Sequence, residues 1–308
     1  MTNKTLIFGH KNPDTDSIAS AFVMENLEKS LGNENVEAVA LGNPNKETQY
    51  ALSYIGMESP RTIQVVENEQ NVILVDHNET SQTVENIENA NILKVIDHHT
   101  MNFCVSHPIY YRAEPIGCTS SVLYKMYKEY ELDITPAMAT LMLSAIISDT
   151  LLFKSPICTR EDITIAQKLA IIANIDISSY GMELLKAGTD ISDFSPEQVI
   201  NIDSKLFEKD GKKFKIAQIN TADIDGVFTN QPYFEAAIND EIEKEKLDLY
   251  VFTVTDILNS NSKIISLGES SPVVEKAFGV PLDNHTAMLE NVVSRKKQIL
   301  PNILDNLE

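Results

Sequence analysis

Short apolar runs alternate with segments of helical periodicity in the first part of the chain. The runs predict strands at residues 5–8, 36–41, 72–75 and 93–96, because they are mostly apolar and rich in β-branched residues. Apolar positions at steps of three or four residues predict a helix after the first strand, ending at Gly32. Strands that alternate with helices in this way are typical of a parallel sheet covered on both faces. The predicted fold class is therefore α/β, with a mainly parallel sheet covered by helices in the N-terminal domain.

Capping residues set the expected limits of the helices. The residue before Pro13 is disfavoured in the α region, so the first helix is predicted to begin at Asp16 or Ser17, either of which can cap it. Further helices are predicted at residues 117–130, after a cap at Thr135 with Pro136 in the first position, and at residues 161–186. The helix after Thr135 is apolar on most sides, and we therefore expect it to be buried.

A polar, turn-rich sequence, AGTDISDFS, occupies residues 187–195. We therefore predict a first domain at residues 1–187, a linker at residues 188–195 and a smaller C-terminal α/β domain at residues 196–308. In the second domain the pattern predicts an acidic helix after the linker, a helix from about Gln231, and strands at residues 214–219, 249–255 and 264–267.

Length and charge restrict the possible partners. The 308 residues are long for one domain and sufficient for two, and 43% of them are hydrophobic, which is enough for ordinary globular cores. The formal net charge of −20 makes duplex nucleic acid and anionic membranes poor partners, and we expect neither to bind. If the substrate is a phosphate compound, bound metals and a local cationic patch must reverse the sign of the charge at the site.

The cysteines and the N-terminal sequence indicate a cytoplasmic protein. Cys104, Cys118 and Cys158 form neither a CxxC pair nor a disulfide framework, so we expect reduced, buried thiols. The sequence MTNKTLIFGH has no signal-peptide pattern, and no window of the chain reaches transmembrane length.

Polar side chains follow three of the predicted strands. His10 follows the first strand, Asp76 the third, and His98 and His99 the fourth. Ligands of open α/β sheets bind beyond the carboxyl ends of the strands, so we expect these side chains to converge. Imidazole and carboxylate without thiolate suit a divalent metal such as Mn²⁺. There are too many such groups for one ion, whereas two ions that share a carboxylate would use them all, and two-metal sites are suited to phosphoryl transfer to water.

Further acidic residues extend this set. Asp14 and Asp16 lie in GHKNPDTDS, and Asp149 is expected just past the buried helix, where a cation would offset both the helix dipole and the cost of desolvation. The alternative for Asp149 is an exposed position in the following loop. Asp97 is interpreted either as an acceptor that orients an imidazole or as a cap at the strand end. No functional role is assigned to the remaining histidines, His77, His107 and His285.

Three adjacent cations lie near the C-terminus in the sequence Ser294-Arg295-Lys296-Lys297-Gln298. The chain has 25 basic and 45 acidic residues, so this cluster needs an explanation. It is either a solvated helix face or a phosphate clamp, in which Arg offers a planar fork and Lys a point charge. Lys205 is a further candidate for such a clamp.

The segments GHKNPDTDS, VDHNE, VIDHHT, SDT and SRKKQ, in this order, resemble the manganese-dependent family II inorganic pyrophosphatases of the DHH superfamily. The resemblance covers the whole chain, whereas the DHH tripeptide alone would indicate only the superfamily. It implies a DHH-type N-terminal domain and a DHHA2-type C-terminal domain, joined by a flexible linker. It also implies that pyrophosphate is hydrolysed to two phosphates in the cleft between the domains.

The resemblance also implies a role for each candidate residue. The first metal would be held by His10, Asp14 and Asp76, and the second by Asp16, Asp76, His98 and Asp149, with Asp76 bridging. The diphosphate would be bound by His99, Lys205, Arg295 and Lys296. His99 could protonate the leaving oxygen, and Asp14 or Asp16 could accept the proton of the nucleophile. The expected cofactors are two Mn²⁺, or Co²⁺, with additional Mg²⁺ that arrives with the substrate, and the expected assembly is a homodimer formed through the N-terminal domain.

Three other functions are weighed against this one. An exopolyphosphatase of the same superfamily is the nearest alternative. A DHH phosphodiesterase that acts on oligonucleotides is less favoured, because the chain lacks a glycine-rich GGGH-like motif and has no Trp on which bases could stack. A metal-binding regulatory module without turnover is the most remote, since cations in addition to a two-metal site argue for catalysis.

Overall fold

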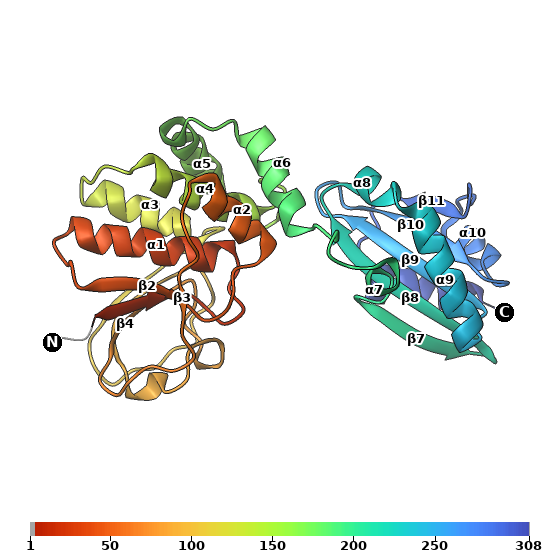
Figure 1. Cartoon of the computed structure of the whole chain (residues 1–308), viewed down its shortest axis with the longest axis horizontal. Helices are drawn as coiled ribbons and strands as arrows, with labels where there is room; N and C mark the ends of the chain where they lie inside the picture. The colour runs from red at the N-terminus through yellow and green to blue at the C-terminus, as the bar shows by residue number, and fades with distance from the viewer. Residues whose placement is uncertain (1–3, 308) are drawn as a thin grey trace. The chain divides into compact units, whose positions relative to one another are not determined.

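The computed structural model describes residues 4–307 and consists of two compact units, Met1–Gly188 and Thr189–Glu308. Both units are α/β structures, and each has its own sheet (Figure 1). The helix α6, Ile177–Gly188, continues to the last residue of the first unit, so the first residue of the predicted linker at 188–195 is helical. That this linker is flexible stays a prediction.

The first unit is built on a six-stranded sheet in which every pairing is parallel. Its order is β3-β2-β1-β4-β5-β6, with in-register pairs such as Ile7 with Ala38 and Ile7 with Ile73. The direction of strand succession reverses between β1 and β4, which creates a switch point where ligands of open sheets bind. The strands are β1 Thr5–Phe8, β2 Val36–Ala40, β3 Arg61–Thr62, β4 Asn71–Val75, β5 Asn91–Asp97 and β6 Tyr110–Ala113.

The helices of this unit lie together on one side of its sheet (Figure 1). The buried helix predicted after Thr135 is confirmed, because Leu141, Met142 and Ile146 have at most 1% of their surface exposed. The helices are α1 Thr15–Ser30, α2 Lys46–Tyr54, α3 Thr119–Glu129, α4 Pro136–Thr150, α5 Arg160–Ala173 and α6.

The opposite face of the first sheet is covered by mainly irregular chain rather than by long helices. Val84 and the 3₁₀ turn η2, Ile87–Asn89, pack there against the strand residues Phe8, Val72 and Leu74. Both faces are thus covered, as expected, but helices cover one face and mainly irregular chain covers the other.

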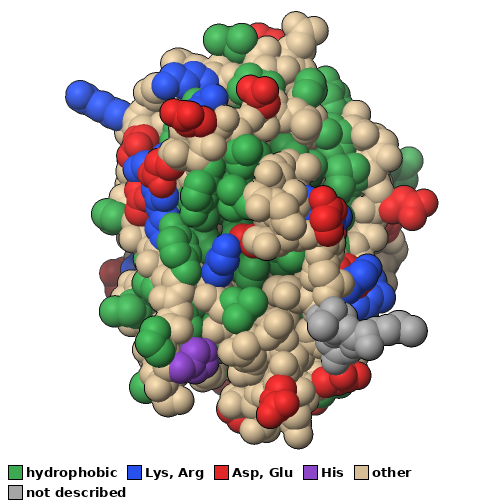
Figure 2. Space-filling model, turned by 90° about the vertical axis from the view of Figure 1, so that its left-hand side faces the viewer, with side chains coloured by type: hydrophobic (Ala, Val, Ile, Leu, Met, Phe, Trp, Pro, Cys, Tyr) green, Lys and Arg blue, Asp and Glu red, His purple; other side chains and the backbone are tan. Residues whose placement is uncertain are grey.

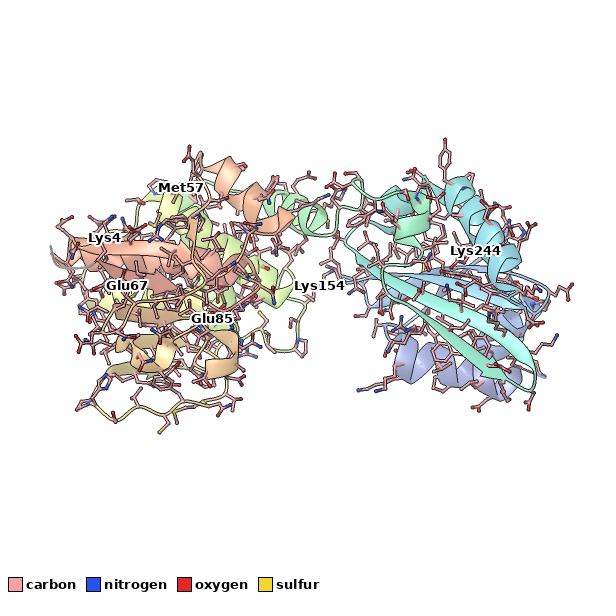
Figure 3. The ribbon with its side chains drawn as sticks, turned by 60° about the horizontal axis from the view of Figure 1, so that its bottom comes forward. Lys4, Met57, Glu67, Glu85, Lys154 and Lys244 are labelled. Atoms are coloured by element: carbon pink, nitrogen blue, oxygen red, sulfur yellow. The ribbon has the colours of Figure 1, made fainter. Side chains whose placement is uncertain are left out.

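The sheet of the second unit is mixed and lies between two helical layers (Figure 3). Its order is β11-β10-β9-β8-β7, and only the β8–β9 pairing is parallel. Successive residues of β9 point into opposite cores, Leu249 toward Ile303 and Tyr250 toward Phe234. The strands are β7 Ser204–Lys209, β8 Lys212–Thr221, β9 Leu249–Asp256, β10 Asn261–Leu267 and β11 Thr286–Leu289. The helices are α7 Pro196–Val199, α8 Ile224–Phe228, α9 Gln231–Glu245, α10 Pro272–Phe278, the π-helical segment η3 Arg295–Ile299 and α11 Leu300–Asn306.

Several predicted limits are wrong. The first helix begins at Thr15 rather than at Asp16 or Ser17, because the Asp14 side chain caps it by accepting from the backbone N–H of Ser17 at 3.0 Å. The single helix predicted at residues 161–186 is two helices, since Asn174 adopts a left-handed conformation that ends α5. The acidic helix after the linker is only the four-residue α7. The helices α2, α8, α10 and α11 and the strands β3, β6, β7 and β11 were missed, and these four strands are the edge strands of the two sheets.

Candidate metal centre

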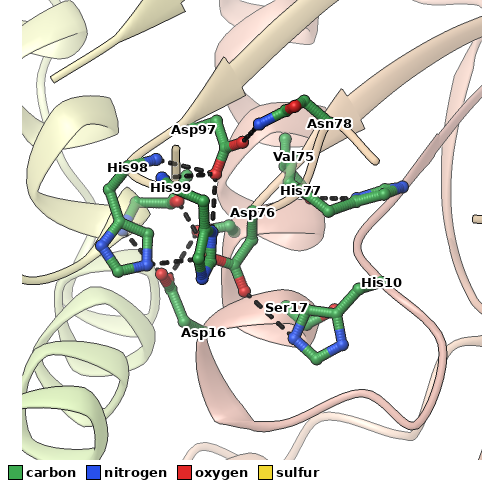
Figure 4. Close-up of polar contacts among 12 residues, drawn as sticks. His10, Asp16, Ser17, Val75, Asp76, His77, Asn78, Asp97, His98 and His99 are labelled. Carbon is green, nitrogen blue, oxygen red and sulfur yellow. Dashed lines mark hydrogen bonds and ion pairs between the residues drawn. The ribbon is translucent and has the colours of Figure 1, made fainter. Parts of the chain in front are cut away.

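Three neighbouring strands of the first sheet end in the polar residues expected to converge. His10 lies beyond β1, Asp76 beyond β4, and His98 and His99 beyond β5. Their side chains meet at the carboxyl edge of the sheet, at its switch point (Figure 4). Potential ligand atoms lie within 4.8 Å of one another in three groups, which are His10, Asp14 and Asp76; Asp16, His98 and Asp149; and Asp76, His98 and His99.

Asp76 connects these groups through its two carboxylate oxygens. Oδ2 lies 3.5 Å from Nε2 of His10, and Oδ1 lies 3.4 Å from Nε2 of His98. The residue is buried and has a left-handed backbone with φ of 57°, which is uncommon outside glycine. Its N–H donates to the carbonyl oxygen of Ile96 at 2.9 Å, and Thr119 Oγ1 donates to Oδ1 at 3.0 Å. The carboxylate is therefore fixed with one oxygen toward each side, as a bridging ligand requires.

The imidazoles of His10 and His98 are oriented by backbone carbonyl groups. Nδ1 of His10 lies 2.8 Å from the oxygen of Lys11, and Nδ1 of His98 lies 3.0 Å from the oxygen of Ile116. When Nδ1–H donates to the carbonyl group, the neutral ring keeps a lone pair on Nε2. In both rings Nε2 faces Asp76, so the nitrogen that can bind a metal is the one directed at the shared carboxylate.

Asp149 lies within the last turn of α4 rather than just past it, and this corrects the sequence-based placement. Its carboxylate is half-buried and belongs to the same group as Asp16 and His98. Burial, together with the charges of Asp16 and Asp76, raises the pKa of Asp149 well above its ordinary value. The alternative of an exposed loop residue is excluded.

The carboxylate of Asp16 is held by the N-terminus of α3. Oδ2 accepts from the backbone N–H of Thr119 at 2.6 Å, and Oδ1 accepts from the N–H of Ser120 at 3.1 Å. Oδ1 also accepts from the hydroxyls of Ser120 at 2.7 Å and of Ser20 at 2.8 Å. An anion at a helix N-terminus is stabilised by the free amides and by the helix dipole. Sequence analysis missed these supporting residues, although the run Thr119-Ser120-Ser121 at the start of a helix was a possible signal.

Asp97 orients an imidazole, and that interpretation is confirmed. Its Oδ1 lies 2.8 Å from Nδ1 of His99 and also accepts from the N–H of His98 at 2.8 Å. Asn78 Nδ2 donates to Oδ2 at 2.5 Å. Burial by itself would raise the pKa of Asp97, but the hydrogen bonds from His99 and Asn78 lower it to about 2. Asp97 is therefore an anion that fixes the ring of His99, whose own pKa is raised mainly by this bond.

The centre concentrates negative charge. Burial and the charge of Asp16 raise the pKa of Asp76 to about 8. Burial by itself would lower the pKa of His10, but Asp14 and Asp76 raise it to about 9. Burial by itself would also lower the pKa of His98, but Asp76 and Asp16 raise it to about 9. These directions show that the carboxylates repel one another and hold protons on the imidazoles in place of a cation, so the donor set fits divalent metal ions.

Cys118 is a neighbour of this centre that the sequence did not reveal. It occupies the N-cap position of α3 without a capping hydrogen bond from its side chain, and it is fully buried. Burial followed by the charges of Asp16 and Asp149 raises the pKa of its thiol well above the ordinary value. The expectation of buried thiols is confirmed for Cys118 but is wrong for Cys104, which is exposed, and for Cys158, which is half-buried.

A pocket of about 540 Å³ opens beside the centre and is lined by His10, Asp76, His77, Asn78 and His99 among others. The ring of His77 is turned away from Asp76 (Figure 4), and Nδ1 lies 2.9 Å from the carbonyl oxygen of Val75. Burial lowers the pKa of His77 to about 4, so the ring is neutral. The other two histidines without an assigned role lie elsewhere, with His107 near the oxygen of Ile92 and His285 near Glu235.

The predicted cationic residues belong to the second unit. Lys205 is exposed on β7, and Lys296 and Lys297 are exposed on η3. Arg295, by contrast, is buried, and its Nη2 forms an ion pair with Oδ1 of Asp203 at 2.9 Å. The structure thus separates one fixed cation from three solvated ones, and it adds Asp203, a residue that sequence analysis had not singled out.

None of the helices within residues 4–307 combines the length and the apolar character that a membrane span requires.

The family profile described as DHH family, N-terminal domain, matches residues 4–146, and that of the DHHA2 domain matches residues 182–306. The first match lies within the first unit, and the second covers the last residues of α6 and most of the second unit, which is the expected order.

Proteins of similar sequence extend this assignment over the whole length. A protein of Bacillus velezensis with the name "Probable manganese-dependent inorganic pyrophosphatase" is 52% identical over 304 residues, which are 98% of each chain. A Brevibacillus brevis protein with the same name is 51% identical over 99% of each chain. The crystal structure of a Methanococcus jannaschii protein provisionally assigned to family II inorganic pyrophosphatase matches with a TM-score of 0.63 and 37% identity, over 97% of this chain and 98% of the other. On these matches and on its two domain types, the chain belongs to the manganese-dependent, family II inorganic pyrophosphatases of the DHH superfamily.

Proposed function

We propose that the protein hydrolyses inorganic pyrophosphate to two phosphates at a two-metal centre on the first unit. The position of Asp76 is the observation that carries this proposal, because its two carboxylate oxygens face His10 on one side and His98 on the other. A carboxylate shared in this way is what a pair of adjacent divalent ions requires. Membership of the pyrophosphatase family supports pyrophosphate as the substrate.

In this proposal one metal is bound by His10, Asp14 and Asp76, and the other by Asp16, Asp76, His98 and Asp149. The nitrogen and oxygen donors suit Mn²⁺ or Co²⁺, and additional Mg²⁺ would arrive with the substrate. Two such cations, when bound, lower the pKa of a shared water molecule and neutralise charge on the phosphates. The excess of buried carboxylate supports this occupancy, since it raises the pKa values of Asp76 and Asp149 in the absence of metal.

The protein's own residues position the substrate and move protons. Asp97 holds Nδ1 of His99, so Nε2 of this half-exposed ring is available to a phosphate oxygen. Because Asp97 raises the pKa of His99, the ring can carry a proton at neutral pH and donate it to the leaving phosphate. Asp14 and Asp16 are the two candidates for accepting the proton of the nucleophile.

The diphosphate would be bound by Lys205, Arg295 and Lys296 of the second unit together with His99 of the first. All the proposed metal ligands belong to the first unit, so the substrate would contact both units, in a cleft between them. Its binding would then favour a closed arrangement, because only that arrangement offers both sets of contacts. A net charge of −20 supports the need for these cations, since the protein as a whole repels an anionic substrate.

A substrate and metal panel tests this function. Pyrophosphate, tripolyphosphate and a dinucleotide are each incubated with chelated protein reloaded with Mn²⁺, Co²⁺ or Mg²⁺, and released phosphate or mononucleotide is measured. We expect pyrophosphate to be hydrolysed fastest, with Mn²⁺ or Co²⁺ as the resident metal, because imidazole ligands favour transition metals over Mg²⁺. Faster cleavage of tripolyphosphate would indicate an exopolyphosphatase, and full activity in Mg²⁺ alone would contradict the metal assignment.

We further propose that the protein is a cytoplasmic homodimer formed through the first unit. The edge strand β6 supports this assembly, because it pairs with a neighbouring strand of the described sheet on one side only and Tyr110 exposes 40% of its surface. Hydrophobic side chains also gather near the centre of one face of the first unit (Figure 2). Free cysteines are consistent with a reducing compartment. Light scattering at several concentrations tests the assembly, and a concentration-independent monomer would contradict it.

A further inference from the structure

Arg295 is held by a closed ring of contacts within the second unit. We call Asp203, Gln218 and Arg295 the arginine cradle. The N–H of Gln218 donates to the carbonyl oxygen of Asp203 at 3.0 Å, and the N–H of Arg295 donates to Oε1 of Gln218 at 2.9 Å. The guanidinium closes the ring, because Nη1 donates to the carbonyl oxygen of Asp203 and Nη2 pairs with its Oδ1 at 2.9 Å. Both ends of Arg295, its backbone and its guanidinium, are therefore fixed.

The parts of the cradle come from three different segments, and these are themselves anchored. Gln218 lies in β8, and its Nε2 donates to Thr255 Oγ1 at 2.8 Å and to the oxygen of Val293 at 2.9 Å. Asp203 directly precedes β7, and Arg295 is the first residue of η3. Gln218 thus connects the start of η3 to two central strands, which fixes the backbone from which Arg295 extends.

The cradle engages only part of the guanidinium. Arginine has five N–H donors, of which one on Nη1 and one on Nη2 are directed at Asp203. The side chain of Arg295 is 10% exposed, whereas that of Asp203 is 56% exposed. Asp203 is therefore largely solvated, while it fixes the plane of a nearly buried fork. Planar, bidentate recognition of phosphate depends on the orientation of that plane.

We propose that Asp203 is a positioning residue, which acts through Arg295 to aim its guanidinium at the diphosphate. This proposal rests on the proposed function, since it takes Arg295 to be a phosphate ligand. It assigns Asp203 no contact with the substrate. It also predicts that the carboxylate of Asp203 assists binding, although its charge has the same sign as that of the substrate. The orientation of Arg295 should add more to the binding free energy than repulsion from a solvated carboxylate subtracts.

A double-mutant cycle tests this role. Asp203→Ala, Arg295→Ala, the double variant and the wild type are loaded with Mn²⁺, and kcat and KM for pyrophosphate are measured with the Kd for methylenediphosphonate, a non-hydrolysable analogue. Asp203→Ala should lower kcat/KM roughly 10-fold and weaken the analogue by a similar factor, as expected for loss of one charge-assisted hydrogen bond. In the Arg295→Ala background the same change should alter either quantity by no more than about twofold. Asp203→Asn, which keeps an oxygen acceptor, should lie between Asp203→Ala and the wild type.

Asp210→Asn provides the matched control. Asp210 lies in the same unit, pairs with Lys209 at 3.8 Å and has a positive φ that asparagine tolerates, so this variant should keep wild-type kinetics. Manganese content and unfolding temperature, measured for all variants, identify any loss through misfolding. The proposal is overturned if Asp203→Ala binds the analogue as well as or better than the wild type. It is also overturned if Asp203→Ala lowers kcat/KM or analogue affinity by the same factor in the Arg295→Ala background as in the wild type. Failure of the wild type to hydrolyse pyrophosphate would instead refute the proposed function, and analogue binding would still report on Asp203.

Discussion

The metal centre of the first unit and the arginine cradle of the second solve opposite electrostatic problems. The centre brings Asp14, Asp16, Asp76 and Asp149 together, and burial followed by the charge of Asp16 raises the pKa of Asp76 to about 8. In the cradle the single cation Arg295 is nearly buried and is neutralised by Asp203. The first site is thus incomplete without added positive charge, whereas the second is balanced in the free protein. We therefore expect metal to be a structural requirement of the first unit alone.

The two sites also differ in how the chain builds them. Residues of the metal centre follow strands of a parallel sheet, so the topology itself brings them to the switch point. Arg295 begins a short π-helical segment, and side-chain hydrogen bonds from Gln218 and Asp203 hold it in place. Removal of a metal ligand should therefore abolish function at the centre. Removal of one side-chain hydrogen bond in the cradle should reduce function only by the contribution of that bond.

The largest effect is expected from removal of the shared carboxylate. Asp76→Ala should abolish metal retention in both positions and reduce pyrophosphate hydrolysis to background, because each metal loses a ligand. Metal content after gel filtration and the rate of phosphate release are the measurements. Asp133→Ala, at an exposed position of the same unit, is the control. A variant Asp76→Ala that kept two metals per chain would break the assignment of a bridging role.

The second prediction separates the two sites. Arg295→Ala should lower kcat/KM for pyrophosphate by about 10²–10³ and leave manganese content unchanged, since one electrostatic contact is lost and no metal ligand. Lys297→Ala is the control, because Lys297 is exposed on the same segment and is given no phosphate contact. Loss of metal from Arg295→Ala, or a larger defect in Lys297→Ala, would show that the two sites are not independent in this way.

A smaller effect is expected from the residue that orients His99. Asp97→Ala should weaken metal retention or activity by roughly 10–100-fold, the usual range for loss of a group that supports a ligand or an active-site ring. Competition with a chelator and steady-state kinetics provide the two measurements. The carboxylate of Asp97 contacts the ring of His99, the proposed proton donor, but only the backbone N–H of His98, a proposed metal ligand. The loss should therefore fall mainly on kcat. Equal losses in Asp97→Ala and Asp76→Ala would contradict the distinction between supporting residue and ligand.

The last prediction is a pH dependence of metal binding. In the metal-free protein the pKa of both His10 and His98 is raised to about 9, so both rings are protonated at pH 7. A protonated imidazole has no lone pair for a metal, and binding must release its proton. Mn²⁺ affinity should therefore rise between pH 7 and pH 9, by at most about tenfold per pH unit for each proton released. Calorimetry in buffers of different ionisation enthalpy measures the released protons, and a pH-independent affinity would contradict the prediction.

The sequence by itself determined the class of fold and the set of candidate residues. The apolar runs located β1, β2, β4 and β5 because each of these strands contains a mainly apolar stretch with buried residues. The edge strands β6 and β7 were missed, since short edge strands with Tyr, Lys and Glu carry little hydrophobic signal. His10, Asp76 and His98 could be singled out because their chemistry coincides with strand ends, and parallel strands all end at one edge.

Only the tertiary structure decided how these residues are supported. Asp16 accepts its hydrogen bonds from Thr119 and Ser120, which are more than one hundred residues away in the chain. Asp203 and Arg295 are 92 positions apart and meet only through the folding of the second sheet. No local pattern encodes such a contact, because a polar residue in a loop has the same sequence signature whether it is solvated or holds a partner. The sequence therefore determines which side chains can bind metal or phosphate, whereas their orientation depends on long-range packing.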